Sequence, residues 1–172
     1  FLYHLDKNLV SIGFVIGLDY KNPYLSPYEE FQRFKMHPLI KPLLDEGRRV
    51  SYGARALNEG GWQSLPKLSF PGGSLIGCDA GTLNTPKIKG THTAMKSGIV
   101  ASENVFRKLE QNLEGVELEN FQSEFNNSWA GKELKAARNV RPSFKYGLKL
   151  GTILTGIDQI FLRGKAPWTL KH

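Results

Sequence analysis

The chain has almost no cysteine and no long apolar run. Cys78 is the one cysteine among 172 residues, so an internal disulfide is excluded, and one thiolate cannot hold an iron–sulfur cluster by itself. No apolar stretch reaches the roughly 20 residues that a membrane-spanning helix needs, and the N-terminus lacks the layout of a signal peptide. Any membrane contact is therefore expected to be monotopic, on one face of a bilayer.

Two motifs of nucleotide and thiol chemistry are also missing. No Gly-x-Gly-x-x-Gly run follows a predicted strand, so the main ADP-binding unit of a Rossmann-type flavin domain is absent from this sequence. No CxxC motif is present and no histidine lies near Cys78 in sequence, so we interpret Cys78 as a packing residue. The sequence predicts no catalytic nucleophile and no metal site.

Positive charge is in excess, with 23 Lys and Arg against 16 Asp and Glu and a formal net charge of +7. Such a balance suits nucleic acid, an anionic lipid surface or an acidic protein partner. The basic residues form no dense cluster interleaved with aromatics, as a nucleic-acid groove would have, so we predict no nucleic-acid partner. A hydrophobic content of 40% is typical of a globular chain.

The first part of the chain reads as strands with one helix. Residues Phe1 to Leu18 alternate loosely around a polar turn and predict a hairpin. Ser26 followed by Pro27 is typical of a helix start, with Ser26 as N-cap. Alternating apolar residues predict a further strand over 48–57.

Helical spacing dominates after that. Small and apolar residues recur from Thr91 onward, a second helix is expected from Leu118 to about Pro142, and a third over 153–162. We predict a mixed α/β (α+β) fold in one compact piece. Its expected parts are a sheet-rich portion over 1–70, a cofactor loop with its helix over 71–114, and a helical portion over 115–172.

The segment most suited to chemistry is the loop that leads into the helix at Thr91. Gly77 and Asp79 stand in a Gly-rich turn, and Pro86 and Gly90 come shortly before the helix. A helix N-terminus offers free N–H groups to an electron-rich ligand edge, and a carboxylate accepts hydrogen bonds from sugar hydroxyls. By motif alone, flavin binding and an ordinary structural loop both remain open.

A second candidate is an apolar surface near the end of the sequence. Basic residues flank it, as in helices that lie in a membrane interface. An amphipathic helix packed on a core is the alternative reading of the same pattern. The apolar residues singled out are Ile153, Leu154, Ile157, Phe161 and Trp168.

Three separated motifs resemble one known family. They are the runs Tyr52–Gly61, Pro86–Gly98 and Pro167–His172. Their residues, and the order in which they follow one another, are similar to those of electron-transfer flavoprotein:ubiquinone oxidoreductases. Because Phe1 begins inside an apolar pattern, we expect the chain to be an internal piece of such a protein. The resemblance covers the sequence from end to end.

The resemblance implies part of an FAD/NAD(P)-binding, glutathione-reductase-like fold with a quinone-binding sheet region. It implies a monotopic flavoenzyme of a bacterial or mitochondrial inner membrane that passes electrons from reduced electron-transfer flavoprotein to ubiquinone. Its cofactors would be FAD and a four-iron (4Fe-4S) cluster whose ligands lie outside this sequence. The chain alone is predicted to be inactive.

The same resemblance implies particular roles for residues. The second FAD contact is expected at Gly77, Asp79, Pro86, Gly90, Thr91 and Thr93. The residues expected to face quinone and membrane are the five apolar ones near the end of the chain, with residues 1–5 and 12–18 as further walls of the quinone groove.

Two other functions stay open at the level of sequence. One is a flavoprotein of the geranylgeranyl-reductase or hydroxylase type, which shares the Asp loop before a helix. The other is a non-catalytic peripheral module that docks on membranes through its basic charge and last helix. Bound flavin would separate the enzyme readings from the docking module.

Overall fold

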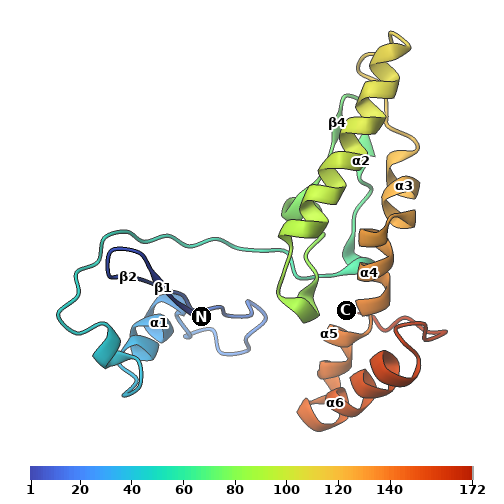
Figure 1. The fold of residues 1–172 in the computed structure, drawn as a ribbon. Coiled ribbons are helices and arrows are strands. Elements are labelled where there is room, and N and C mark those ends of the chain that lie inside the picture. Colours follow the sequence, from blue (N-terminus) through green and yellow to red (C-terminus); the bar gives the residue numbers. More distant parts are fainter. Residues whose placement is uncertain (172) are drawn as a thin grey trace. The chain divides into compact units, whose positions relative to one another are not determined.

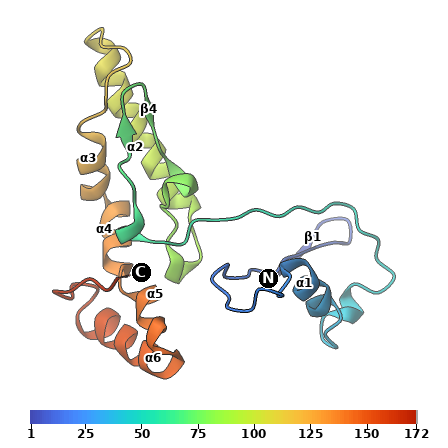
Figure 2. The ribbon, with the colours of Figure 1, turned by 180° about the vertical axis from the view of Figure 1, so that it is seen from behind.

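The computed structural model describes residues 1–171 and divides the chain into two compact units. The first unit is Phe1–Ala54 and the second begins at Arg55. Figure 1 and Figure 2 show both units from opposite sides. Helices and two small antiparallel sheets make up the regular structure of residues 1–171, which confirms the predicted mixture of α and β. The predicted boundaries at 70/71 and 114/115 stay predictions.

The first unit opens with the expected hairpin. Strand β1 (Leu2–Leu5) pairs antiparallel with β2 (Leu9–Ile12), and Leu2 lies opposite Ile12. Lys7 and Asn8 between them have φ of 59° and 56°, as the central residues of a type I′ turn do. Gly13 still exchanges two backbone hydrogen bonds with Phe1, both of 3.0 Å. Residues 14–18 then continue without strand pairing, so the prediction that the second strand reaches Leu18 is wrong.

Helix α1 (Pro27–Lys35) starts where the sequence indicates. Ser26 is extended, and its Oγ accepts a hydrogen bond from Glu29 N–H at 3.4 Å. Pro27 stands at the first helical position, where the missing N–H has no cost. A short 3₁₀ helix, η1 (Lys41–Leu43), follows.

No side chain of the first unit is buried, although all of residues 1–54 are described. Large apolar side chains stand in solvent instead, among them Tyr3, Leu5, Val15, Leu18 and Leu39. A unit of this size needs buried apolar area to offset its conformational entropy. The first unit therefore needs a covering surface that its own residues do not supply.

The second unit is mostly helical. It contains one hairpin, β3 (Ser69–Phe70) with β4 (Gly73–Ser74), and the long helix α2 (Thr91–Glu110). Both views show α2 running beside the chain that forms α3 and α4 (Figure 1, Figure 2). The other elements are η2 (Trp62–Ser64), η3 (Gly77–Ala80), η4 (Thr85–Lys87), α3 (Phe121–Asn127), α4 (Trp129–Ala137), α5 (Val140–Ser143), η5 (Phe144–Tyr146), α6 (Leu148–Gly156) and the π-helical turn η6 (Ile157–Phe161).

The core of the second unit lies between α2 on one side and α3 and α4 on the other. Phe121 and Phe125 are fully buried in it, and each such aromatic contributes about 1.5–3 kcal/mol by leaving water. Its other members are Leu68, Ala80, Val100, Ala101, Leu118, Ala130 and Leu134. This packing holds α2 and the loop before it against a rigid surface.

Three expected elements differ from the structure. Residues 48–57 have no strand structure, because a strand needs a partner and no described segment pairs with them. The helix expected from 118 to about 142 is three helices, α3, α4 and α5. The break between α3 and α4 comes at Ser128, which is extended (ψ 165°) and caps α4 through its Oγ. The last helix begins at Leu148 rather than 153, directly after Gly147.

Candidate functional site

The predicted Asp loop forms the 3₁₀ helix η3 rather than an open turn. Gly77 has a φ of 65° and donates its N–H to Ser97 Oγ on α2 at 2.9 Å. The Asp79 side chain is 81% exposed and lies 3.3 Å from Arg55 Nη2. Asn58 Nδ2 contacts the carbonyls of Cys78 and Asp79 at 3.3 and 3.2 Å. The Asp79 carboxylate is therefore presented to solvent at a fixed backbone position.

The next turn, η4, is fixed by Asn84. Its side chain is buried, and its Oδ1 accepts from Lys87 N–H at 3.3 Å. The backbones of Asn84 and Lys89 pair across the turn. Pro86 is exposed at the tip, and Gly90 then serves as the N-cap of α2. The sequence Asn-Thr-Pro-Lys is a local cap motif that signals this turn.

Helix α2 begins with its first N–H groups free of intrahelical partners. Ala94 donates the first intrahelical bond, to Gly90 O at 2.8 Å, so the N–H groups of Thr91, His92 and Thr93 point out of the helix start. The Thr93 side chain is fully buried, and its Oγ lies 2.6 Å from Thr82 O and 2.9 Å from Gly90 O. Its hydroxyl is thus occupied inside the loop, whereas Thr91 is exposed.

Glu133 on α4 contacts this loop at several points. Its Oε1 accepts from Asn84 Nδ2 at 2.7 Å and lies 2.8 Å from His92 Nε2. Its Oε2 accepts from Lys87 Nζ at 2.7 Å. Burial alone would raise the pKa of Glu133, but the hydrogen bonds from His92, Lys87 and Asn84 and the Lys87 charge outweigh it and lower the pKa to about 2. No local signal in the sequence connects Glu133 with the loop.

Acid is expected to destabilise the second unit through Glu133. Its pKa falls from 4.5 to about 2 in the folded chain, so its contribution is complete above about pH 4.5 and is lost as the pH falls towards 2. The shift corresponds to at most about 3 kcal/mol. Denaturant unfolding between pH 2 and pH 7 measures this contribution. Glu133→Gln should lower the free energy of unfolding at neutral pH and make it depend less on pH. An unchanged pH dependence in Glu133→Gln would contradict the assignment.

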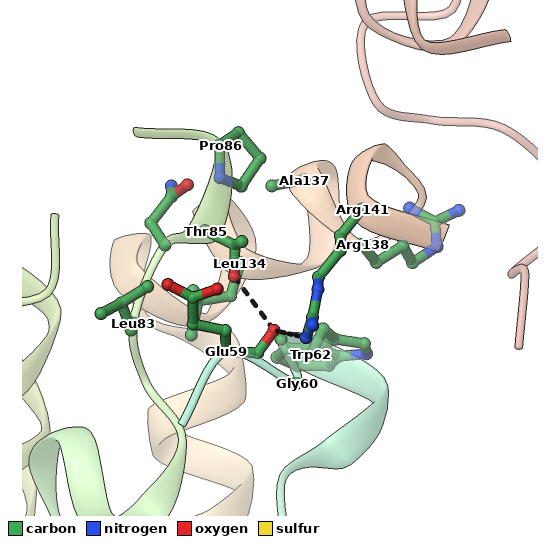
Figure 3. Close-up of a pocket in the computed structure, with 12 residues that line it drawn as sticks. Glu59, Gly60, Trp62, Leu83, Thr85, Pro86, Leu134, Ala137, Arg138 and Arg141 are labelled. Carbon is green, nitrogen blue, oxygen red and sulfur yellow. Dashed lines mark hydrogen bonds between the residues drawn. The ribbon is translucent and has the colours of Figure 1, made fainter. Parts of the chain in front are cut away.

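A small pocket joins the loop to the helices (Figure 3). Glu59 O accepts from Thr85 Oγ1 at 3.2 Å and from Arg141 Nη1 at 2.9 Å. Trp62 and Leu134 close the pocket, whose volume is about 10 Å³. That is room for about one water molecule. The pocket is therefore a packing contact between the loop and the helices, and it is too small to hold a cofactor.

A larger apolar cavity of about 360 Å³ lies around α6 and η6. Four of the five apolar residues singled out from the sequence line it, namely Ile153, Leu154, Ile157 and Trp168. Phe161 does not line it and is 78% exposed. The remaining lining residues are Asn139, Ser143, Tyr146, Leu150, Asp158 and Leu170. The predicted apolar surface is thus partly a cavity wall and partly open surface.

Asp158 and Arg138 near this cavity were not expected from the sequence. Asp158 is buried, and its Oδ1 has no hydrogen-bond partner among the described residues. Arg138 is buried as well and donates to the carbonyls of Gly164, Ala166 and Trp168. The Arg138 contacts join residues 26 to 30 positions apart, and such contacts produce no periodic pattern in the sequence.

The described part of the chain contains neither a spanning helix nor a metal-binding cluster. No helix within residues 1–171 is both long enough and apolar enough to cross a membrane. No cluster of three or more His, Cys, Asp or Glu side chains in the described part is arranged to hold a metal ion.

Comparisons with known proteins point to one family, through a family model over the first third of the chain and through relatives over all of it. A family model described as "ETF-QO, ubiquinone-binding" matches residues 1–57, which include the predicted quinone walls at 1–5 and 12–18. "Electron transfer flavoprotein-ubiquinone oxidoreductase, mitochondrial" from Homo sapiens is 57% identical, and the match covers 100% of this chain and 29% of that protein. The Oryza sativa protein of the same name is 52% identical over 100% of this chain and 29% of its own length. The chain thus spans under a third of the length of these relatives. The predicted family is confirmed, because this chain is related from end to end to one segment of the electron transfer flavoprotein-ubiquinone oxidoreductases.

Proposed function

We propose that this chain is the quinone-binding and flavin-contacting part of an enzyme that passes electrons from reduced electron-transfer flavoprotein to ubiquinone. The observation that carries the proposal is the 57% identity with the human relative over all of this chain. The match of residues 1–57 to a ubiquinone-binding model supports the quinone part. The names of the relatives favour this function over a reductase or hydroxylase of another flavoprotein type and over a docking module.

The loop before α2 fits the second contact of an FAD. The outward N–H groups at the start of α2 suit an electron-rich flavin edge, and the exposed Asp79 carboxylate suits a hydroxyl donor. We propose Gly77, Asp79, Pro86, Gly90 and Thr91 as the contacting residues, with Thr93 holding the loop from inside. The parent fold would be of the FAD/NAD(P)-binding, glutathione-reductase-like type.

Bound FAD would supply the redox chemistry, and this chain would tune and orient it. Reduction of ubiquinone to ubiquinol consumes two electrons and two protons. Because ubiquinone is itself a largely apolar molecule, it would need an apolar approach to the redox centre. The exposed apolar side chains of residues 1–54 and the cavity at Ile153, Leu154, Ile157 and Trp168 are the candidates for that approach. A 4Fe-4S cluster would take its thiolates from outside this chain, which contains one cysteine.

Membrane association would be monotopic. Phe161 and Ile160 are exposed beside the basic residues Arg163 and Lys165, an arrangement that suits apolar insertion below anionic headgroups. The relatives are named mitochondrial, which favours a mitochondrial membrane over a bacterial one. On its own the chain is predicted to have no quinone reductase activity.

A chimera tests the proposed function. This sequence would replace the matching segment of the human relative, and the purified protein would be assayed for bound flavin and for electron transfer from reduced electron-transfer flavoprotein to a soluble ubiquinone. We expect a flavin-bearing, active chimera. In Asp79→Ala, loss of a hydrogen bond to the cofactor should weaken FAD binding about 10-fold.

The control is Asp45→Ala, another exposed aspartate, in the first unit. It should leave FAD affinity unchanged. A folded chimera without flavin would overturn the proposal and favour a docking module. A flavin-bearing chimera with no response to Asp79→Ala would reject the site and keep the enzyme.

A further inference from the structure

One carboxylate gathers three donors from the short loop 84–92. Glu133 contacts Asn84, Lys87 and His92 at 2.7, 2.7 and 2.8 Å. These donors stand at the N-cap of η4, within η4 and in the first turn of α2, at the start, middle and end of 84–92. A single side chain of α4 therefore fixes the course of the whole loop.

The support for this carboxylate is rigid. Ala130 and Leu134, which flank Glu133 on α4, are buried in the core. Trp129, also on α4, stacks on the His92 ring with centroids 5.8 Å apart and an angle of 11° between the planes. The loop is thus held by a carboxylate and an aromatic ring from one packed helix.

The donor set requires a carboxylate at position 133. Each Glu133 oxygen is already an acceptor, and Lys87 adds a positive charge. Glutamine has one acceptor oxygen, and its NH₂ group would face a donor of the loop. Aspartate is one methylene shorter and would not reach all three donors from the same helix.

We propose that Glu133 is the positioning residue of the flavin-contacting loop: it sets the register of Pro86, Gly90 and Thr91 against the cofactor. This inference rests on the proposed function. Glu133 does not touch the cofactor itself, because its oxygens face Asn84, Lys87 and His92. It acts through the loop backbone and the start of α2, where N–H groups are displayed.

Glu124 on α3 provides a matched control. It also bridges to α2, with Oε2 at 2.6 Å from Arg107 Nη2 and 2.8 Å from Asn104 Nδ2. These contacts lie in the second half of α2, away from the loop. Replacing either carboxylate removes charge-assisted hydrogen bonds between helices, but only Glu133 reaches the segment 84–92.

The experiment uses the chimeric holoenzyme with Glu133→Gln and Glu124→Gln. The readouts are the dissociation constant of FAD after reconstitution of apoprotein, the flavin midpoint potential, the melting temperature, and amide hydrogen exchange over 84–92. Glu133→Gln should weaken FAD binding about 10-fold to 100-fold, as expected for loss of charge-assisted bonds, shift the potential, and speed exchange in the loop. Glu124→Gln should lower the melting temperature and leave the FAD dissociation constant and the potential within about twofold.

Equal FAD affinity and potential in both variants would overturn the inference and leave Glu133 as a stability contact only. Should Glu133→Gln fail to fold, Lys87→Met removes one donor from the exposed side of the cluster, where Lys87 is 55% exposed. It should weaken FAD binding several-fold, and Lys87→Arg should restore it. If the unsubstituted chimera binds no flavin, the proposed function fails, and the positioning role falls with it.

Discussion

Phe125→Ala is expected to lower the free energy of unfolding of the second unit by about 4 kcal/mol, enough to unfold a marginal domain. Phe125 is fully buried in the cluster that α3 shares with α2 and α4. Removing its ring takes away apolar burial and leaves a cavity that a packed helix interface refills poorly. Denaturant unfolding followed by tryptophan fluorescence gives the value.

Phe106→Ala is the matched control, because Phe106 lies on α2 and is 61% exposed. Its replacement should change the free energy of unfolding by no more than about 0.5 kcal/mol. Similar losses at Phe106 and Phe125 would mean that the core does not lie where α2, α3 and α4 meet. The comparison therefore tests the packing that holds the loop before α2.

Arg138→Met should release the segment 164–170 and cost about 3 kcal/mol or more. The guanidinium of Arg138 donates to the carbonyls of Gly164, Ala166 and Trp168 and to Thr169 Oγ1. Without it the carbonyls of Gly164 and Ala166 lose a buried donor, whereas Trp168 O keeps one from Asn139 Nδ2 at 3.1 Å. Methionine keeps much of the apolar volume. Trypsin cleavage after Lys165 should become at least about 10-fold faster, since cleavage follows the population of the opened segment.

Lys135→Gln removes the same charge from an exposed position in the last turn of α4, the helix that Arg138 caps. Cleavage in this control should match the parent protein. If Arg138→Met also leaves cleavage unchanged, the segment is held by other contacts, such as those of Gln63 Nε2 with Arg138 O and Leu170 O at 2.7 and 2.9 Å. Because Trp168 lines the apolar cavity, release of the segment should also open that cavity.

Features encoded within a few residues of sequence were predicted correctly. The Ser26-Pro27 start of α1, the turn after residue 5 and the start of α2 at Thr91 each depend on backbone chemistry that the local residue types determine. The family resemblance rested on motifs of this short-range kind as well. Sequence reasoning is reliable there because few competing structures satisfy the same local groups.

Features that depend on a distant partner were missed or misjudged. The alternation over 48–57 permits a strand but supplies no neighbour for it. The break at Ser128 depends on one serine adopting an extended conformation to cap α4. Glu133 and Arg138 act across 41 residues to His92 and across 26 to Gly164, and hydrophobic periodicity contains no information about such pairs. The candidate loop was therefore predictable, but the residues that hold it in place were not.

The absence of buried side chains in residues 1–54 makes the order of that unit depend on what occupies its apolar surface. By mass action, a ligand or lipid that binds only the ordered unit raises its melting temperature in proportion to the logarithm of the ligand concentration. Changing an exposed residue such as Val15 would then alter the affinity of the unit for that ligand or lipid more than it altered the stability of the unit without ligand. The melting temperature of this unit therefore measures whether its apolar surface is occupied, and no activity assay is needed for that measurement.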